Sequence, residues 1–243
     1  MPAQTKLTGG TDLKGLAPSL TELLVDVFRQ AGRVSIQPWD YTEGNRVLGF
    51  YKVAQASGAT LNLGAAAHMA STRWTDPSAL FVPIKIRAGW TITGAVTAAT
   101  PMDLQLVIAR GFTVDFTTNS TAANLSAVSN TNKLHNRMGA SLMGINGPRI
   151  ATTAAMSGQT LTADANPIAM CPFANQPSGN ATVTQAIGVG HPMQELYKLE
   201  PQGAHPIVLT NNEGLLVQPV TAGPTSGSVK YYVEWEWAEL AGF

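Results

Sequence analysis

The sequence predicts a mainly β protein: an antiparallel β-sandwich preceded by an N-terminal arm and a short helix. The clearest observation is the stretch Ser228–Leu240, "SVKYYVEWEWAEL", in which apolar and polar side chains alternate from Val229 to Trp237. A side-chain period of two is the signature of a strand with one face in a core and the other in water. Other apolar stretches of strand length are separated by Gly, Pro and Asn turns, without the strand–helix alternation of a parallel sheet. Together these observations favour a sandwich.

The C-terminal alternation assigns each residue of the last strand to one of two faces. The core side carries large side chains: Tyr231, Val233, Trp235 and Trp237. The opposite side, which includes Lys230, Glu234 and Glu236, is expected to be exposed to water. Because a slip of one residue would exchange the two faces, this pattern fixes the orientation of the strand.

The composition favours a protein with a weakly charged surface. Charged residues make up 12% of the 243, against about 25% in typical soluble proteins, and 15 Lys and Arg together balance 15 Asp and Glu. This balance argues against nucleic-acid binding, which needs a basic patch to replace phosphate counterions. It favours a protein that works inside an assembly, where neutral surfaces face other subunits.

Neither export nor a membrane span is expected, because the chain lacks a signal peptide and any apolar run of about 18 residues. The single cysteine, Cys171, excludes an intrachain disulfide and is expected to be a buried, inert thiol. Stability must therefore come from packing rather than from cross-links.

The N-terminal segment is expected to form an arm and a helix, residues 1–32, ahead of a sandwich domain of residues 33–243. Residues 1–18 have no periodicity, which is typical of an extended arm. Ser19 and Glu22 form a capping box that begins the helix, and Gly32 ends it. Because a helix this short is unstable alone, its apolar stripe must pack on its own sandwich or on a neighbouring subunit. We expect the stripe to make assembly contacts, through Leu20, Leu23, Leu24, Val27 and Phe28.

Turn residues divide the chain between the helix and the last strand. Ser57 and Gly58 separate two apolar stretches and predict a hairpin. Pro83 lies within an alternating stretch and cannot donate a ladder hydrogen bond, so its strand is expected at a sheet edge or with a bulge. The sequence Asn-Asn-Glu-Gly at 211–214 tolerates positive φ angles and predicts a second hairpin.

The stretch 103–117 is expected to form one long strand that kinks at Gly111. Residues 119–165 are rich in Asn, Ser, Thr, Ala and Gly and are expected to form long loops with one or two short strands. On the long strand, the apolar side chains expected to point inward are Leu104, Leu106, Ile108, Phe112, Val114 and Phe116.

The sequence contains no arrangement of residues typical of catalysis or metal binding. Glu234 and Glu236 are expected to be neighbours in water rather than a buried pair in a cleft. The histidines lie far apart, and none has a Cys, His or carboxylate at ligand spacing: His68, His135, His191 and His205. We therefore expect a non-enzymatic protein without catalytic residues, metal ligands or a cofactor.

Four segments share a pattern of strands and turns: "TRWTDPSALFVPIKIRAG" (Thr72–Gly89), "LQLVIARGFT" (Leu104–Thr113), "HPIVLTNNEGLLVQ" (His205–Gln218) and "KYYVEWEWAEL" (Lys230–Leu240). This pattern resembles a group of tailed-bacteriophage virion proteins of the jelly-roll type. In that group a tryptophan-bearing strand, an "hPLVLxxNEGhhhR"-like hairpin and a final "hxVEWxE" strand recur. The chain departs from the pattern at Gln218, where a basic residue is common, and in its N-terminal helix.

The resemblance implies a jelly-roll sandwich and a structural component of a phage particle. It implies a capsid decoration or cement protein, synthesised in the host cytoplasm, that binds the major capsid protein on the capsid exterior as a homotrimer. Neither nucleic acid nor a membrane is an expected partner. Two alternatives stay open, because a fold does not fix a function. One is a tail or fibre component that binds host receptors through exposed tryptophans and polar loops, and the other is a carbohydrate-active enzyme.

Overall fold

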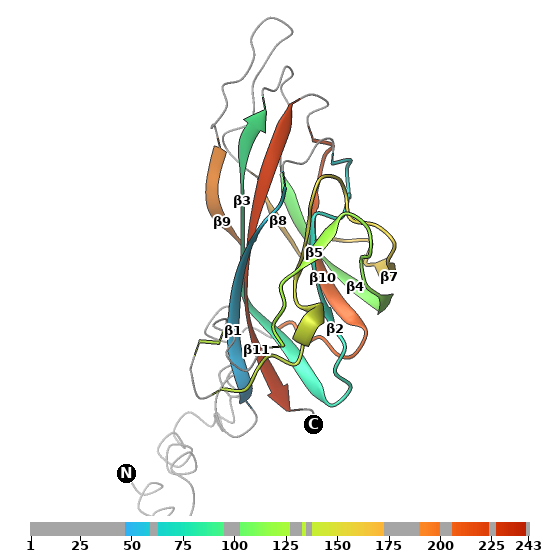
Figure 1. The fold of residues 1–243 in the computed structure, drawn as a ribbon, viewed down its shortest axis with the longest axis vertical. Coiled ribbons are helices and arrows are strands. Elements are labelled where there is room, and N and C mark those ends of the chain that lie inside the picture. The colour runs from blue at the N-terminus through green and yellow to red at the C-terminus, as the bar shows by residue number, and fades with distance from the viewer. Residues whose placement is uncertain are drawn as a thin grey trace, which may run out of the picture.

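The computed structural model describes residues 47–58, 63–94, 103–126, 133–134, 138–172, 190–199, 206–223 and 227–241. Within these ranges the chain is mainly β, and its strands form two antiparallel sheets packed as a sandwich (Figure 1). The helical structure in these ranges is one short 3-10 turn, Gly144–Asn146. The predicted arm and helix lie outside the described residues, so the domain boundary after residue 32 stays a prediction.

The first sheet has four strands in the order β1-β11-β3-β9. Their bounds are β1 (Val47–Ala56), β11 (Ser228–Ala241), β3 (Ala79–Gly94) and β9 (Gly190–Lys198). The C-terminal strand β11 therefore lies inside this sheet, between the first described strand and β3.

The second sheet has seven strands, in the order β5-β6-β2-β10-β4-β7, with β8 also paired to β4. The bounds are β5 (Ser120–Ala122), β6 (Arg149–Ala151), β2 (Ala70–Trp74), β10 (Glu213–Pro219), β4 (Leu104–Val114), β7 (Thr160–Ala163) and β8 (Ala169–Cys171). The described residues of the stretch 119–165 thus include three short strands, β5, β6 and β7, where we expected one or two.

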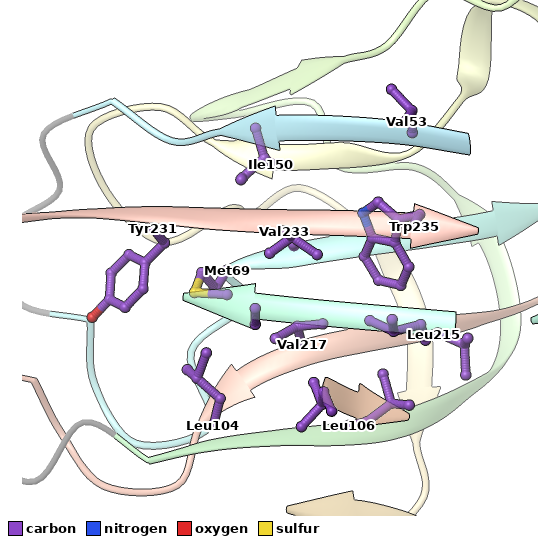
Figure 2. Close-up of a cluster of buried hydrophobic side chains, with 14 of the residues drawn as sticks. Val53, Met69, Leu104, Leu106, Ile150, Leu215, Val217, Tyr231, Val233 and Trp235 are labelled. Atoms are coloured by element: carbon purple, nitrogen blue, oxygen red, sulfur yellow. The ribbon is translucent and has the colours of Figure 1, made fainter. Parts of the chain in front are cut away.

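The main core lies between the two sheets and is filled from both. The core-facing residues of β11 have little exposed surface: Tyr231 2%, Val233 0%, Trp235 1% and Trp237 0%. Figure 2 shows Tyr231, Val233 and Trp235 beside Leu104, Leu106, Leu215 and Val217 of the second sheet. Burial of this many large apolar side chains provides the main driving force for folding.

The outward side of β11 is half-buried rather than exposed, which corrects the prediction for Lys230, Glu234 and Glu236. Lys52 of β1 and Arg87 of β3 flank the two carboxylates, because β11 has a neighbouring strand on each side. The alternation therefore predicted which face of β11 is the core, but not how far the neighbouring strands would cover the other face.

Pro83 lies in an interior strand, and a bulge accommodates it there. β3 pairs with β11 on one side and with β9 on the other. The register between β3 and β11 shifts between Glu236 and Trp237, next to the Trp237–Pro83 pair. This bulge is one of the two outcomes expected for a proline in a strand, because proline has no backbone N–H to donate.

The kink predicted in the long strand is confirmed at Gly111. This residue has φ +56°, and the register between β4 and β7 shifts between Arg110 and Val114. Beyond the kink, Phe112 and Phe116 are buried in a second apolar cluster, which includes Val107, Ala109 and Leu216. Val114 was expected to point inward but is 44% exposed, because the kink ends the simple alternation.

The second predicted hairpin does not form, although its turn does, and the second strand predicted for the first hairpin, residues 59–64, lies largely outside the described residues. Asn212 has φ 62°, as its turn requires, but the chain before it bridges Phe81 while β10 after it pairs with β2 and β4. Similarly, β1 pairs with β11, and at its end the Gly58 N–H donates to the carbonyl of Ala151 in β6 (3.3 Å). Both turns carry the chain from one sheet to the other.

Candidate functional site

The outward face of the four-stranded sheet carries a network of ion pairs. Lys52 lies 3.1 Å from Glu234 and 3.8 Å from Glu236, and Arg87 lies 3.7 Å from Glu234. One more pair, Lys85 with Glu195 at 3.5 Å, joins β3 to β9. Because acidic and basic groups are matched along this network, it presents no basic patch to a polyanion.

A buried carboxylate lies at one end of the sandwich, where β11 ends. Glu239 has no exposed surface and pairs with Gly49 at the start of β1. Its Oε1 accepts hydrogen bonds from Ser141 Oγ (2.5 Å) and Trp237 Nε1 (3.1 Å). Its Oε2 accepts one from the backbone N–H of Leu142 (3.0 Å). Three donors thus compensate much of the cost of burying this group.

The environment of Glu239 favours its protonated form. Burial raises the pKa of the Glu239 carboxyl above its ordinary value, and the hydrogen bonds from Leu142, Ser141 and Trp237 oppose that rise. Burial, together with the negative charge of Glu239, also raises the pKa of the Tyr51 hydroxyl. A carboxylate that is shut off from solvent and surrounded by aromatic rings is poorly placed to meet a substrate.

An aromatic cluster connects this buried carboxylate to both sheets. The ring of Trp237 stacks on Tyr51 with 5.6 Å between ring centroids and on Phe81 with 6.0 Å. Trp74 of β2 continues the cluster at 5.8 Å from Phe81. Its indole N–H donates to the carbonyl of Ala79 (2.8 Å), so this polar atom is satisfied within the core.

Residues 138–146, which we call the edge loop, are held beside β1 and over Glu239. The backbone N–H of Phe50 donates to Met138 Sδ (3.1 Å), and the Tyr51 hydroxyl donates to the carbonyl of Gly139 (3.2 Å). Met143 is 2% exposed and belongs to the main core. The Glu239 carboxylate holds the middle of the loop through Ser141 and Leu142.

Large apolar side chains are exposed along the edge loop and the neighbouring part of β1. The loop contributes Leu142 (42% exposed) and Ile145 (65%), and β1 contributes Leu48 (43%). Leu134 is 52% exposed, and its backbone N–H donates to the carbonyl of Phe50 (2.9 Å). We call these four residues the edge patch. Exposed apolar groups of this kind are typical of surfaces that contact other protein subunits.

His68 and Cys171, which were singled out in the sequence, lie in surroundings that fit a structural role. His68 is half-buried; its Nδ1 lies 3.1 Å from Gln218 Nε2, and burial lowers the pKa of the imidazole. Cys171 is free and buried, its Sγ lies 3.0 Å from Gln194 Oε1, and burial raises the pKa of the thiol. Within the described ranges no group of three or more His, Cys, Asp or Glu side chains could hold a metal ion.

The structure describes only some of the predicted site residues. The core residues of β11 are described above, whereas the predicted assembly contacts lie outside the described residues: Leu20, Leu23, Leu24, Val27 and Phe28. His135 and His205 also lie outside them. Sequence reasoning missed Glu239. Extending the alternation of β11 by two residues beyond Trp237 would have placed the Glu239 side chain inward.

No protein-family model matches the chain, and no curated protein matches it in sequence. Among the residues that the structure describes, no helix is long and apolar enough to cross a membrane.

Proposed function

We propose that this chain is a non-enzymatic structural protein of a tailed-bacteriophage particle. In this proposal it is a jelly-roll decoration or cement protein that binds the major capsid protein on the capsid exterior and stabilises the head shell. It acts as a homotrimer after synthesis in the host cytoplasm, and its N-terminal arm and short helix precede the jelly roll.

The observation that carries the proposal is the order of the strands. The chain alternates between the sheets through β1, β2, β3 and β4 and again through β9, β10 and β11. When the short strands β5, β6 and β7 of the second sheet are set aside, the two sheets read β1-β11-β3-β9 and β2-β10-β4-β8. This arrangement fits the eight-stranded jelly roll, an architecture found in viral capsid proteins as well as in lectins and cupins.

The resembling segments fall at the centre of this arrangement. Thr72–Gly89 spans the end of β2 and most of β3, and Leu104–Thr113 is most of β4. His205–Gln218 includes most of β10, and Lys230–Leu240 is most of β11. The resemblance therefore involves strands that pair with one another inside the two sheets, rather than one isolated motif.

The exposed surface supports subunit contact over the two alternatives. Trp74, Trp90, Trp235 and Trp237 are each at most 1% exposed, so these tryptophans are core residues and not a stacking surface for a receptor sugar. Glu234 and Glu236 lie on a sheet face in ion pairs with Lys52. The edge patch provides exposed apolar side chains for contact with another protein subunit.

Electron cryomicroscopy of the phage that encodes this chain tests the proposal. Particles with the gene are expected to show density on the outside of the head shell that particles without the gene lack, and to retain their genome to a higher temperature. Missing density at the tail or fibres would instead support the receptor-binding alternative. Particles that do not differ in structure or heat resistance would rule out a structural role in the virion.

A further inference from the structure

The sequence contains a single Asn-Gly pair, Asn146–Gly147, and it lies at the end of the edge loop. Asn146 is the last residue of the short 3-10 turn. It directly follows Ile145, which is 65% exposed and belongs to the edge patch. An asparagine side chain can react with the backbone nitrogen of the next residue, and glycine favours this reaction because it has no Cβ to obstruct the approach.

The side chain of Asn146 is available for such a reaction. It is half-buried, and no described residue forms a hydrogen bond with its amide group. Two other asparagines differ in this respect. The side-chain oxygen of Asn124 accepts hydrogen bonds from the backbone N–H (3.0 Å) and the hydroxyl (2.6 Å) of Ser126. That of Asn212 accepts one from the guanidinium of Arg73 (3.4 Å), and neither asparagine is followed by glycine.

Gly147 has an unengaged backbone nitrogen but a fixed position. None of the described residues accepts a hydrogen bond from its N–H. A Cβ at this residue would collide with the carbonyl oxygen of Ala123, so the backbone conformation seen here requires glycine. The carbonyl of Pro148 accepts hydrogen bonds from the backbone N–H of Ala123 (2.9 Å) and from Gln55 Nε2 (2.7 Å). The 3-10 turn on the other side is one turn long, and such turns have poorer hydrogen-bond geometry than an α-helix.

We propose that Asn146 is a site of spontaneous deamidation, which alters the edge patch. The backbone nitrogen of Gly147 attacks the side-chain carbonyl carbon of Asn146, and a new C–N bond forms. The side-chain nitrogen leaves as ammonia and takes the proton of the attacking N–H with it. The resulting succinimide ring is then opened by water at either of its two carbonyl carbons, which gives aspartate or isoaspartate. Water is the only co-reactant, and nothing is oxidised or reduced.

Both products change the edge patch. Each places a negative charge next to Ile145, and a charge resists the loss of water that an apolar contact requires. Isoaspartate also lengthens the main chain by one CH2 group ahead of Gly147. Because Gly147 and Pro148 are fixed, this extra length must be taken up by the 3-10 turn and the edge loop before it. The reaction does not depend on the proposed function, because it takes place in the isolated protein.

Peptide mass spectrometry of the folded full-length protein, incubated at mildly alkaline pH in heavy-oxygen water, tests the proposal. Asn146 is expected to convert at least roughly tenfold faster than Asn124 and Asn212, because only Asn146 precedes a glycine. Each converted chain should gain a heavy oxygen at residue 146, since the new carboxyl oxygen comes from water. Asn146→Gln lengthens the side chain by one CH2 group and should prevent the conversion.

Conversion of Asn146 in the folded protein, without comparable conversion of Asn124 and Asn212, supports the proposal. No conversion of Asn146, conversion at the rate of the other two, or conversion only after unfolding in urea overturns it. Hydrogen exchange tests the effect on the edge loop: residues 138–146 should exchange faster in the converted protein, while β11 exchanges as before. Asn146→Asp adds the charge without the longer main chain and separates the two effects. Equal exchange of the edge loop before and after conversion overturns the proposed change in the edge patch.

Discussion

Replacing Glu239 by glutamine is expected to destabilise the sandwich most at acidic pH and less as the pH rises. The two oxygens of Glu239 accept hydrogen bonds from three donors, and Leu142 N–H binds the oxygen that Ser141 and Trp237 do not use. Glutamine has one oxygen and one NH2 group, so in either orientation at least one of these donors faces another donor. A buried donor without an acceptor costs about 1–3 kcal/mol.

The pH dependence follows from the direction of the pKa shift. Burial raises the pKa of Glu239 in the folded protein above its ordinary value of 4.5, so the folded state binds the proton more tightly than the unfolded state. The resulting stability is fully present below pH 4.5 and is lost as the pH rises through the folded-state pKa. The glutamine variant has no such titration. The stability difference between wild type and Glu239→Gln should therefore shrink with rising pH.

Urea unfolding followed by tryptophan fluorescence, from about pH 5 to pH 8, measures this difference directly. Groups that titrate alike in both proteins cancel when the two are compared. Glu236→Gln on the outward face is the matched control, and it should change stability by less than about 1 kcal/mol because its ion pair with Lys52 is partly solvated. A wild-type advantage that stays constant or grows with pH would refute the reasoning.

Three further outcomes are expected. Trp235→Ala should lower the free energy of unfolding by about 3–5 kcal/mol, and Tyr232→Ala on the outward side should lower it by much less. An unchanged urea midpoint for Trp235→Ala would contradict this. Gly49→Ala should lower the melting temperature, because the new Cβ would collide with the hydroxyl and ring of Tyr51. Gly64→Ala meets nothing within 4 Å and should melt as the wild type does. Images of the particle should show the protein as homotrimers, so isolated single copies without a like neighbour would count against that assembly.

The sequence predicted well those features that depend on neighbouring residues. The alternation from Val229 to Trp237 identified a strand and its core side, and Gly111 identified a kink, because both signals are local properties of the backbone. The Asn-rich turn was likewise correct at Asn212. The sequence did not predict which strands the segments before and after a turn would pair with. A turn sets the direction of a few residues, whereas strand pairing depends on which sheet edges are available when the chain arrives.

Glu239 shows a second limit of sequence reasoning. A carboxylate at a core position contradicts the binary pattern, so the pattern alone argues for a strand that ends before it. Its burial depends on Ser141 and Leu142, almost a hundred positions earlier in the chain, which cannot be matched to it without the fold. The one local signal was Trp237, which lies two residues before Glu239 on the same face of β11 and donates its indole N–H to the carboxylate.

The topology makes the C-terminal strand necessary for the fold as a whole. β11 pairs with β1, for example Val47 with Leu240, and it pairs with β3 along nearly its full length. The first sheet therefore cannot form until β11 is present. Its core-facing tryptophans also fill the space between the two sheets. Pairings this distant in sequence form slowly, because a long loop must close before the contacts stabilise it. Removing residues 228–243 should therefore abolish cooperative unfolding rather than lower its midpoint, and a truncated chain that retains a sharp urea transition would show that the second sheet folds alone.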